Sequence, residues 1–231
     1  MEPELIEATR LYASRDWQGT LDALDGVDST DKNHLDLAYL LGLCHARLGD
    51  WDEALLFLEQ VVTASDDFMR VSQCRLSLAY VYSRTGRARL AEYELDRLLK
   101  SGFRSAQVLC ALGHLAWTQG QAELAERNYM EALGLDPECA TALNGLGYVL
   151  ASGGKDTARA LTCCRKAVDA HPQNPAYLDS LAWAYFRLGF GEEAKDYLRR
   201  ALALAPQEEE IREHASVMGL DLPALATEYG I

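Results

Sequence analysis

Apolar residues recur at helical spacing along almost the whole chain, and short turns with glycine interrupt them at regular intervals. The stretch 174–206, NPAYLDSLAWAYFRLGFGEEAKDYLRRALALAP, shows the pattern clearly. Leu178, Leu181 and Tyr185 lie three or four positions apart and therefore share one face of a helix. Gly189 favours a turn, because glycine tolerates the positive φ that ends a helix, and a second amphipathic run follows. The pattern predicts two antiparallel helices with an apolar face that they cannot cover alone.

The same pattern recurs with a period of about 34 residues. The turn glycine returns at intervals of 37, 34, 34 and 35 residues, as Gly49, Gly86, Gly120, Gly154 and Gly189. A small residue stands early in each second helix, as Ala54, Ala91, Ala125, Ala160 and Ala194. The first helix admits its partner closely at Leu41-Gly42, Leu78-Ala79, Leu112-Gly113, Leu146-Gly147 and Leu181-Ala182. We expect neighbouring hairpins to cover each other's apolar faces.

This period and residue pattern resembles the tetratricopeptide repeat (TPR) family. The resemblance extends over nearly the whole chain, and it implies an all-α fold: a right-handed α-solenoid of about six TPR helix–turn–helix units with a C-terminal capping helix. The expected units are 1–34, 35–71, 72–105, 106–139, 140–174 and 175–206, which with the capping helix 207–219 form a single solenoid over 1–219. The style of the repeats is typical of bacterial proteins.

The two ends of the chain depart from the repeat. The first unit has Glu7-Ala8 where the others have leucine and a small residue, as expected of a terminal cap. The capping helix 207–219 begins with three glutamates, which complement the positive end of a helix dipole. A second interpretation gives this acidic start a binding role. The tail 220–231 is apolar, and it either packs on the end of the solenoid or docks onto another molecule.

The net charge limits which classes of partner we expect. The 231 residues carry a formal charge of −13, which argues against nucleic acid or an anionic membrane surface as the main partner. No apolar run approaches the ~18 residues of a membrane span, so we expect no membrane insertion. The start of the chain lacks the basic region and apolar block of a signal peptide. We therefore expect a cytoplasmic protein.

Candidate catalytic groups do not converge in the sequence. The five histidines fall in different units or turns and form no metal-binding pair. Segment 152–155 (SGGK) only superficially suggests phosphate binding, because it fills a repeat turn. The six cysteines include no CxxC pair. Cys44 is interpreted as a small buried hydrophobe, and a redox role stays open for the adjacent Cys163 and Cys164. We expect no enzyme activity, no metal and no cofactor.

Candidate binding residues come from the resemblance. In the TPR family the first helices of successive units line a concave groove. The positions that match the groove are Tyr39, Leu43, Arg47, Leu76, Tyr80, Arg84, His114, Trp117, Asn144, Tyr148, Asp179, Trp183, Phe186 and Arg187, with Tyr12 in the first unit. Aromatic residues and arginine dominate binding hot spots, which favours a partner-binding role. The alternative is that the aromatics only fill the seams between units.

The sequence therefore predicts a non-catalytic interaction module or scaffold that binds another protein, as a peptide or a helix, in its concave groove. Two alternatives stay open. In one, the chain is a self-assembling homo-oligomeric scaffold whose tail 220–231 contacts a second copy. In the other, it is a dedicated chaperone for a secreted or surface-assembled protein. The identity of the partner is not encoded in the repeat pattern.

Overall fold

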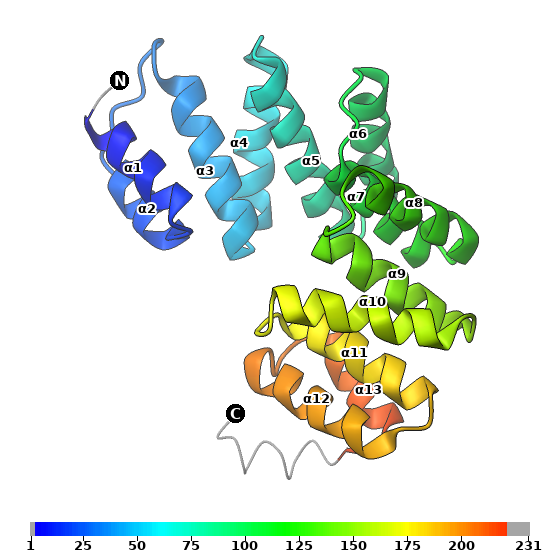
Figure 1. Cartoon of the computed structure of the whole chain (residues 1–231). Coiled ribbons are helices and arrows are strands. Elements are labelled where there is room, and N and C mark those ends of the chain that lie inside the picture. The colour runs from blue at the N-terminus through cyan, green and yellow to red at the C-terminus, as the bar shows by residue number, and fades with distance from the viewer. Residues whose placement is uncertain (1–2, 221–231) are drawn as a thin grey trace. The chain divides into compact units, whose positions relative to one another are not determined.

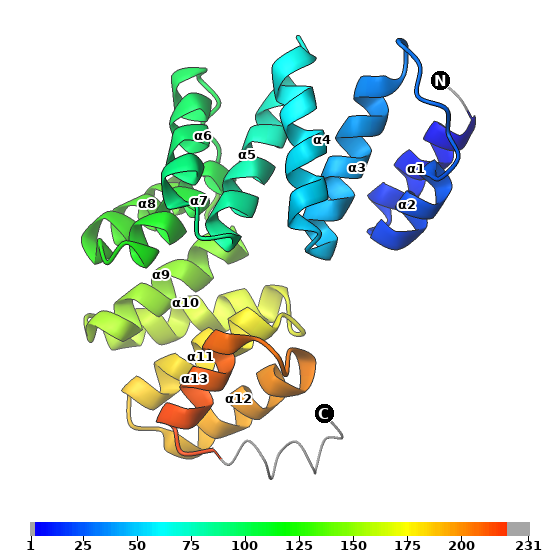
Figure 2. The same ribbon diagram turned by 180° about the vertical axis from the view of Figure 1, so that it is seen from behind.

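The computed structural model describes residues 3–220, which form thirteen α-helices and no strand (Figure 1; Figure 2 shows the reverse side). The all-α repeat fold predicted from the sequence is confirmed. The helices group into two compact units, of which unit 1 ends at Arg104 and unit 2 begins at Ser105. The expected boundaries of the repeat units within a single solenoid stay a prediction.

Unit 1 contains three helix pairs. They are α1 (Pro3–Ala13) with α2 (Trp17–Leu24), α3 (His34–Leu48) with α4 (Trp51–Ala64), and α5 (Phe68–Arg84) with α6 (Ala88–Lys100). We call α1, α3 and α5 the first helices of unit 1, and α2, α4 and α6 its second helices. The first helices are neighbours, since α3 contacts both α1 and α5.

Unit 2 contains three more pairs and one unpaired helix. The pairs are α7 (Ala106–Thr118) with α8 (Ala122–Leu135), α9 (Ala140–Gly153) with α10 (Thr157–Ala170), and α11 (Pro175–Arg187) with α12 (Gly191–Leu204). Its first helices are α7, α9 and α11, and α9 contacts both of the others. The last helix, α13 (Glu209–Val217), lies over α11 and α12 (Figure 2).

The small residue of each first helix marks the closest approach within a pair. A Cβ atom on Gly147 would lie 2.9 Å from the backbone carbonyl oxygen of Ala160, and one on Gly42 would lie 3.0 Å from the backbone nitrogen of Leu58. Such contacts leave no room for a side chain. In the first helix pair, α1–α2, Ala8 takes this place and is fully buried. The departure Glu7-Ala8 therefore keeps the small residue that the packing needs.

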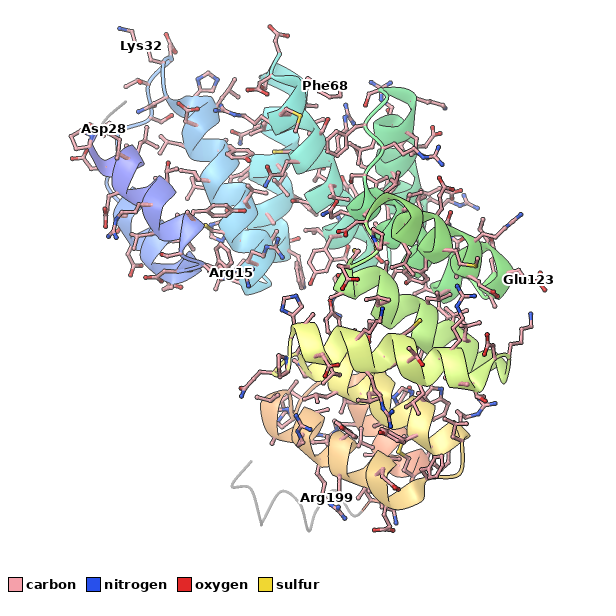
Figure 3. The ribbon with its side chains drawn as sticks, viewed as in Figure 1. Arg15, Asp28, Lys32, Phe68, Glu123 and Arg199 are labelled. Atoms are coloured by element: carbon pink, nitrogen blue, oxygen red, sulfur yellow. The ribbon has the colours of Figure 1, made fainter. Side chains whose placement is uncertain are left out.

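The turns inside the pairs use left-handed backbone. Gly49 (φ 89°) and Gly189 (φ 85°) adopt it at no steric cost. In the α1–α2 turn Arg15 has φ 64°, an uncommon conformation for a residue with a side chain (Figure 3). The first pair thus departs from the others in its turn as well as in its first helix.

Two further expectations concern the C-terminal tail and membrane insertion. The tail hypothesis falls on 220–231, of which 221–231 lie outside the described residues; Leu220 packs against the core of unit 2. Between residues 3 and 220, no helix has the length and apolar character needed to cross a membrane.

Candidate functional site

The predicted groove residues divide between the two units. We call Tyr39, Leu43, Arg47, Leu76, Tyr80 and Arg84, on α3 and α5, the unit 1 surface. We call His114, Trp117, Asn144, Tyr148, Asp179, Trp183, Phe186 and Arg187, on α7, α9 and α11, the unit 2 surface. Their role in binding stays a prediction, and the structure shows what each side chain contacts.

Tyr39 links two first helices of unit 1. Its hydroxyl donates a hydrogen bond of 2.6 Å to Oε1 of Gln73 on α5. The guanidinium of Arg70 lies 5.2 Å from its ring centroid and pairs with Asp36 at 2.7 Å. Burial raises the pKa of Tyr39 to about 12, so the phenol stays a neutral donor. These contacts hold Tyr39 in one orientation between α3 and α5.

The C-terminal end of α3 contacts the first helix pair, α1–α2. Arg47 lies 5.9 Å from the ring centroid of Trp17, whose ring is 5.1 Å from that of Tyr12. Burial raises the pKa of Tyr12, and the charge of Arg47 opposes that rise. Leu43, one turn before Arg47, is buried. Arg47 is exposed while Leu43 offers no surface to a partner in this conformation.

Tyr80 presents the most open ring of the unit 1 surface. Its side chain is 49% exposed, with the ring edge-on to Trp51 at a centroid distance of 6.0 Å. Leu76 and Arg84 lie one turn before and one turn after it on α5, so the three share a face. Leu76 is partly buried and Arg84 is exposed. This face combines an apolar residue, a ring and a guanidinium, which are the groups that anchor protein partners.

The rings of the unit 2 surface are more enclosed. Trp117 meets Tyr148 in a T-shaped contact at 5.4 Å. Trp183 donates from Nε1 to the hydroxyl of Ser152 at 2.9 Å, and Phe186 lies 5.6 Å from its ring. Arg187 lies 5.8 Å from the Trp183 ring and donates 2.8 Å to the backbone oxygen of Ser152. The last turn of α11 is thereby fixed to the end of α9.

A residue that the sequence analysis did not single out, His214 on α13, completes this cluster. Its ring stacks on Trp183 at a centroid distance of 4.4 Å and an interplanar angle of 18°. Nδ1 lies 2.9 Å from both carboxylate oxygens of Asp179, and Nε2 lies 3.2 Å from the hydroxyl of Tyr148. His214 is 7% exposed and Asp179 3%. We call Tyr148, Asp179 and Trp183 the histidine cage.

The pair of His214 and Asp179 is electrostatically coupled. Burial alone would lower the pKa of His214, but the hydrogen bond and the charge of Asp179 outweigh it and raise the pKa above its usual value. Glu210 and Glu213, on the same helix as His214, act in the same direction. Burial raises the pKa of Asp179, and His214 opposes that rise. The pair favours an imidazolium against a carboxylate.

The spacing of α13 contains the signal that the sequence analysis missed. Ile211, His214, Ala215 and Met218 are buried and stand at positions i, i+3, i+4 and i+7 of one helical face. A histidine on an apolar face needs a partner for its ring nitrogens. Nothing in the local sequence indicates that this partner lies on α11 and α9, because that depends on how α13 packs.

Two further polar groups lie on the unit 2 surface. Oδ1 of Asn144 is buried and has no hydrogen-bond partner in the described part of the chain. Asn144 stands one helical turn before Tyr148 on α9, so the two share a face. His114, on α7, is exposed. The unsatisfied acceptor of Asn144 is unusual, since buried polar atoms in native proteins are nearly always paired.

Histidine, cysteine and acidic side chains are the potential metal ligands and nucleophiles of the chain. Across 3–220, no group of three histidine, cysteine or acidic side chains is placed to hold a metal ion. Burial raises the pKa of the Cys44 thiol to about 11 and that of Cys74 to about 12, which keeps them protonated and unreactive. Cys163 and Cys164 are likewise buried with raised pKa values. These thiols act as small apolar side chains.

Comparison with known proteins identifies the repeat. A model described as tetratricopeptide repeat matches residues 7–67 and 110–175, and a second model with the same description matches 176–205. The TPR repeat-containing protein PA4667 of Pseudomonas aeruginosa is 29% identical over 163 residues, covering 71% of this chain. The chain spans only 27% of that relative's length. This relative supports a bacterial origin.

Solved structures share the fold. A chain in the crystal structure of the APC/C hetero-tetramer Cut9-Hcn1 has a TM-score of 0.76 at 15% identity, covering 93% of this chain and 42% of that one. YrrB, described as a TPR protein with an unusual peptide-binding site, has a TM-score of 0.50 at 16% identity, with 85% and 97% covered. At these identities the likeness concerns the fold.

Proposed function

Because the chain belongs to the tetratricopeptide repeat family, whose members are generally non-catalytic interaction modules, we propose that it binds a partner protein on the surfaces of its first helices. The partner is presented as an extended segment or a helix. Apolar and aromatic contacts supply the affinity, and arginine side chains orient the partner through carboxylates or carbonyl oxygens. We place this protein in the cytoplasm.

The observation that carries this proposal is the face of α5 formed by Leu76, Tyr80 and Arg84. Tyr80 keeps half of its side chain exposed on a first helix, although a ring of this size gains free energy when it is buried. Tyr93 on α6 is as exposed, so Tyr80 is distinguished by its place on a first helix between Leu76 and Arg84. YrrB is a neighbour in fold whose description names a peptide-binding site, which agrees with the same use of a TPR surface here.

Charge narrows the class of partner. The chain carries a formal charge of −13, so a partner that is neutral or basic overall associates with less repulsion. The arginines of the two surfaces are exceptions within this acidic background. Arg47 and Arg187 already contact Trp17 and Trp183, so they reach a partner from positions fixed by the rings.

Two tyrosines of unit 1 provide a matched test. Tyr80 on the first helix α5 is 49% exposed, and Tyr93 on the second helix α6 is 54% exposed. We expect Tyr80→Ala to weaken capture of the native partner by about 2 kcal/mol, or roughly 30-fold, because it removes an anchor. Tyr93→Ala should leave capture unchanged. Affinity capture from the native organism identifies the partner, and titration of that purified partner measures both variants.

The two replaced tyrosines have similar exposure, so both variants should lose similarly little stability. A difference in partner binding between them is then not due to unfolding. Equal melting temperatures of Tyr80→Ala, Tyr93→Ala and the parent chain are the control for folding. If the partner binds Tyr80→Ala as tightly as it binds the parent chain, the first-helix surface of unit 1 is not the binding site.

A further inference from the structure

Part of the unit 2 surface is already covered by a helix of this chain. α13 meets it through one face, formed by Ile211, His214, Ala215 and Met218, while most of its other side chains are exposed. Of these four, His214 contacts α9 through Tyr148 and α11 through Asp179 and Trp183. These three residues belong to the positions that the TPR resemblance assigns to partner binding. α13 therefore shows how this surface receives a helix.

The histidine cage has the composition of a site for a cation. Asp179 supplies a buried carboxylate, Trp183 a stacked aromatic face and Tyr148 a hydroxyl. A cation is favoured over a ring face and beside a carboxylate, most strongly where water is excluded. An arginine or a lysine side chain satisfies the same three groups as His214 does, and it carries its charge at every physiological pH.

α13 is a weak occupant of this place on electrostatic grounds. Glu209, Glu210 and Glu213 are exposed on it, and the chain as a whole carries a charge of −13. Burial raises the pKa of the Tyr148 phenol, and the charge of nearby Glu210 raises it further. A helix without these acids meets less repulsion from the rest of the protein.

α13 relies on packing against unit 2 to remain a helix. It spans nine residues, below the length at which helices are stable alone, so it depends on the packing of its buried face. Ile211, Ala215 and Met218 belong to the hydrophobic core of unit 2, so displacement requires this one short element to leave that core by local opening. The unpaired Oδ1 of Asn144 lies one turn from Tyr148, so the same surface keeps an acceptor that α13 does not satisfy.

Building on the function proposed above, we propose that the unit 2 surface binds a partner helix that displaces α13 and inserts an arginine or lysine into the histidine cage. The partner helix carries an apolar residue at i, the cation at i+3, a small residue at i+4 and an apolar residue at i+7, as α13 does with Ile211, His214, Ala215 and Met218. It lacks the acids of α13 and adds a hydrogen-bond donor for Asn144.

Synthetic peptides of residues 207–220 test the proposal. In all of them Glu209, Glu210 and Glu213 are replaced by glutamine, and position 214 holds His, Arg or Ala. Fluorescence anisotropy measures their binding to the full chain. We expect the His214→Arg peptide to bind at least about tenfold more tightly than the His214→Ala peptide, since a charge-assisted contact in the cage distinguishes them.

The full-chain variant Asp179→Asn is the matched control. It keeps the shape of the cage and removes its charge, so the tenfold preference for the arginine peptide should vanish. If this variant does not fold, the comparison of the two peptides on the parent chain decides alone. Equal affinities of the Arg and Ala peptides for the parent chain, or no binding of either, overturn the proposal.

The two proposals fail separately. If Tyr80→Ala abolishes capture of the native partner and the peptides do not bind, the protein-binding function stands and the displacement of α13 is wrong. If the peptides bind as expected and Tyr80→Ala binds the native partner as tightly as the parent chain does, the unit 2 surface binds a helix and the proposed role of the unit 1 surface is wrong.

Discussion

The two units place rings at the same repeat positions and use them differently. In unit 1 the rings of the first helices meet rings at the start of second helices: Tyr12 meets Trp17 on α2, and Tyr80 meets Trp51 on α4 of the preceding pair while staying half exposed. In unit 2 the rings of Tyr148 and Trp183 meet His214 of α13. The same positions therefore serve as an open surface or as a closed one, depending on whether a further helix of the chain packs against them.

In each unit a cation and a carboxylate form a largely buried pair. In unit 1 Arg75 on α5 donates 2.6 Å to Glu94 on α6. In unit 2 His214 on α13 lies 2.9 Å from Asp179 on α11. Arginine stays charged at all physiological pH values, whereas histidine loses its proton within them. The first pair is thus a permanent link between the helices of a hairpin, and the second is a titratable link to a helix outside the hairpins.

The largest effect is expected from breaking the permanent link. Glu94→Ala leaves Arg75 without its carboxylate in a site where both side chains are mostly shielded from water. Removing one member of such a pair costs about 3 kcal/mol of the free energy of unfolding. Amide hydrogen exchange should locate the loss in α5 and α6, and urea unfolding should measure it.

Glu92, two residues earlier on α6, is exposed and provides the control. Glu92→Ala should change the free energy of unfolding by less than about 0.5 kcal/mol. A loss that is equal for both glutamates, or one that spreads into unit 2, contradicts the view that this pair stabilises a hairpin of unit 1.

An intermediate loss of stability should distinguish the covered unit 2 surface from the open unit 1 surface. Trp183→Ala removes the ring that stacks on His214 and the donor to Ser152, so we expect unit 2 to lose about 2 kcal/mol of stability. Tyr80→Ala removes a half-exposed ring, and unit 1 should lose less than about 1 kcal/mol. Urea unfolding of the two variants measures both numbers.

Equal losses for Trp183→Ala and Tyr80→Ala would show that Trp183 is no more engaged by its own chain than Tyr80 is. In that case α13 does not close the unit 2 surface. A melting temperature that falls only for Trp183→Ala, together with faster hydrogen exchange in α13, agrees with the closed surface.

Repeat spacing was sufficient to predict the helix pairs, because the physical causes are local. Gly49 and Gly189 stand where the backbone must turn left-handed, and Gly42 and Gly147 stand where a Cβ would meet the partner helix. Such requirements recur at every period, so they are visible in one sequence. Ala8 meets the same requirement in the first helix pair. The departure of that pair from the repeat pattern therefore does not prevent it from folding as a hairpin.

The use of the groove positions could not be predicted in the same way. Leu43 and Tyr39 belong to the same face of α3 in the repeat pattern, yet Leu43 is buried and Tyr39 is held by Gln73. The contact of His214 with Asp179 and Tyr148 joins residues 35 and 66 positions apart. These outcomes depend on which helices meet, and the identity of the residue at a repeat position does not determine that.

The smallest effect is a dependence of α13 docking on pH. His214 faces Asp179 on α11, Tyr148 on α9, and Glu210 and Glu213 on its own helix. Its pKa is raised in the folded protein, so the stabilisation from its charged form is complete below the unfolded value of about 6.5 and is lost as the pH rises through the folded value. We expect unit 2 to be less stable at pH 9 than at pH 6.

The fluorescence of Trp183 can report this change if Trp17, Trp51 and Trp117 are replaced by phenylalanine. Urea midpoints measured at both pH values then give the slope for unit 2. In Asp179→Asn the carboxylate that raises the pKa of His214 is absent, so the decline between pH 6 and pH 9 should be smaller than in the parent chain. Identical slopes would mean that the histidine does not titrate against Asp179, and α13 would then be held by Ile211, Ala215 and Met218 alone.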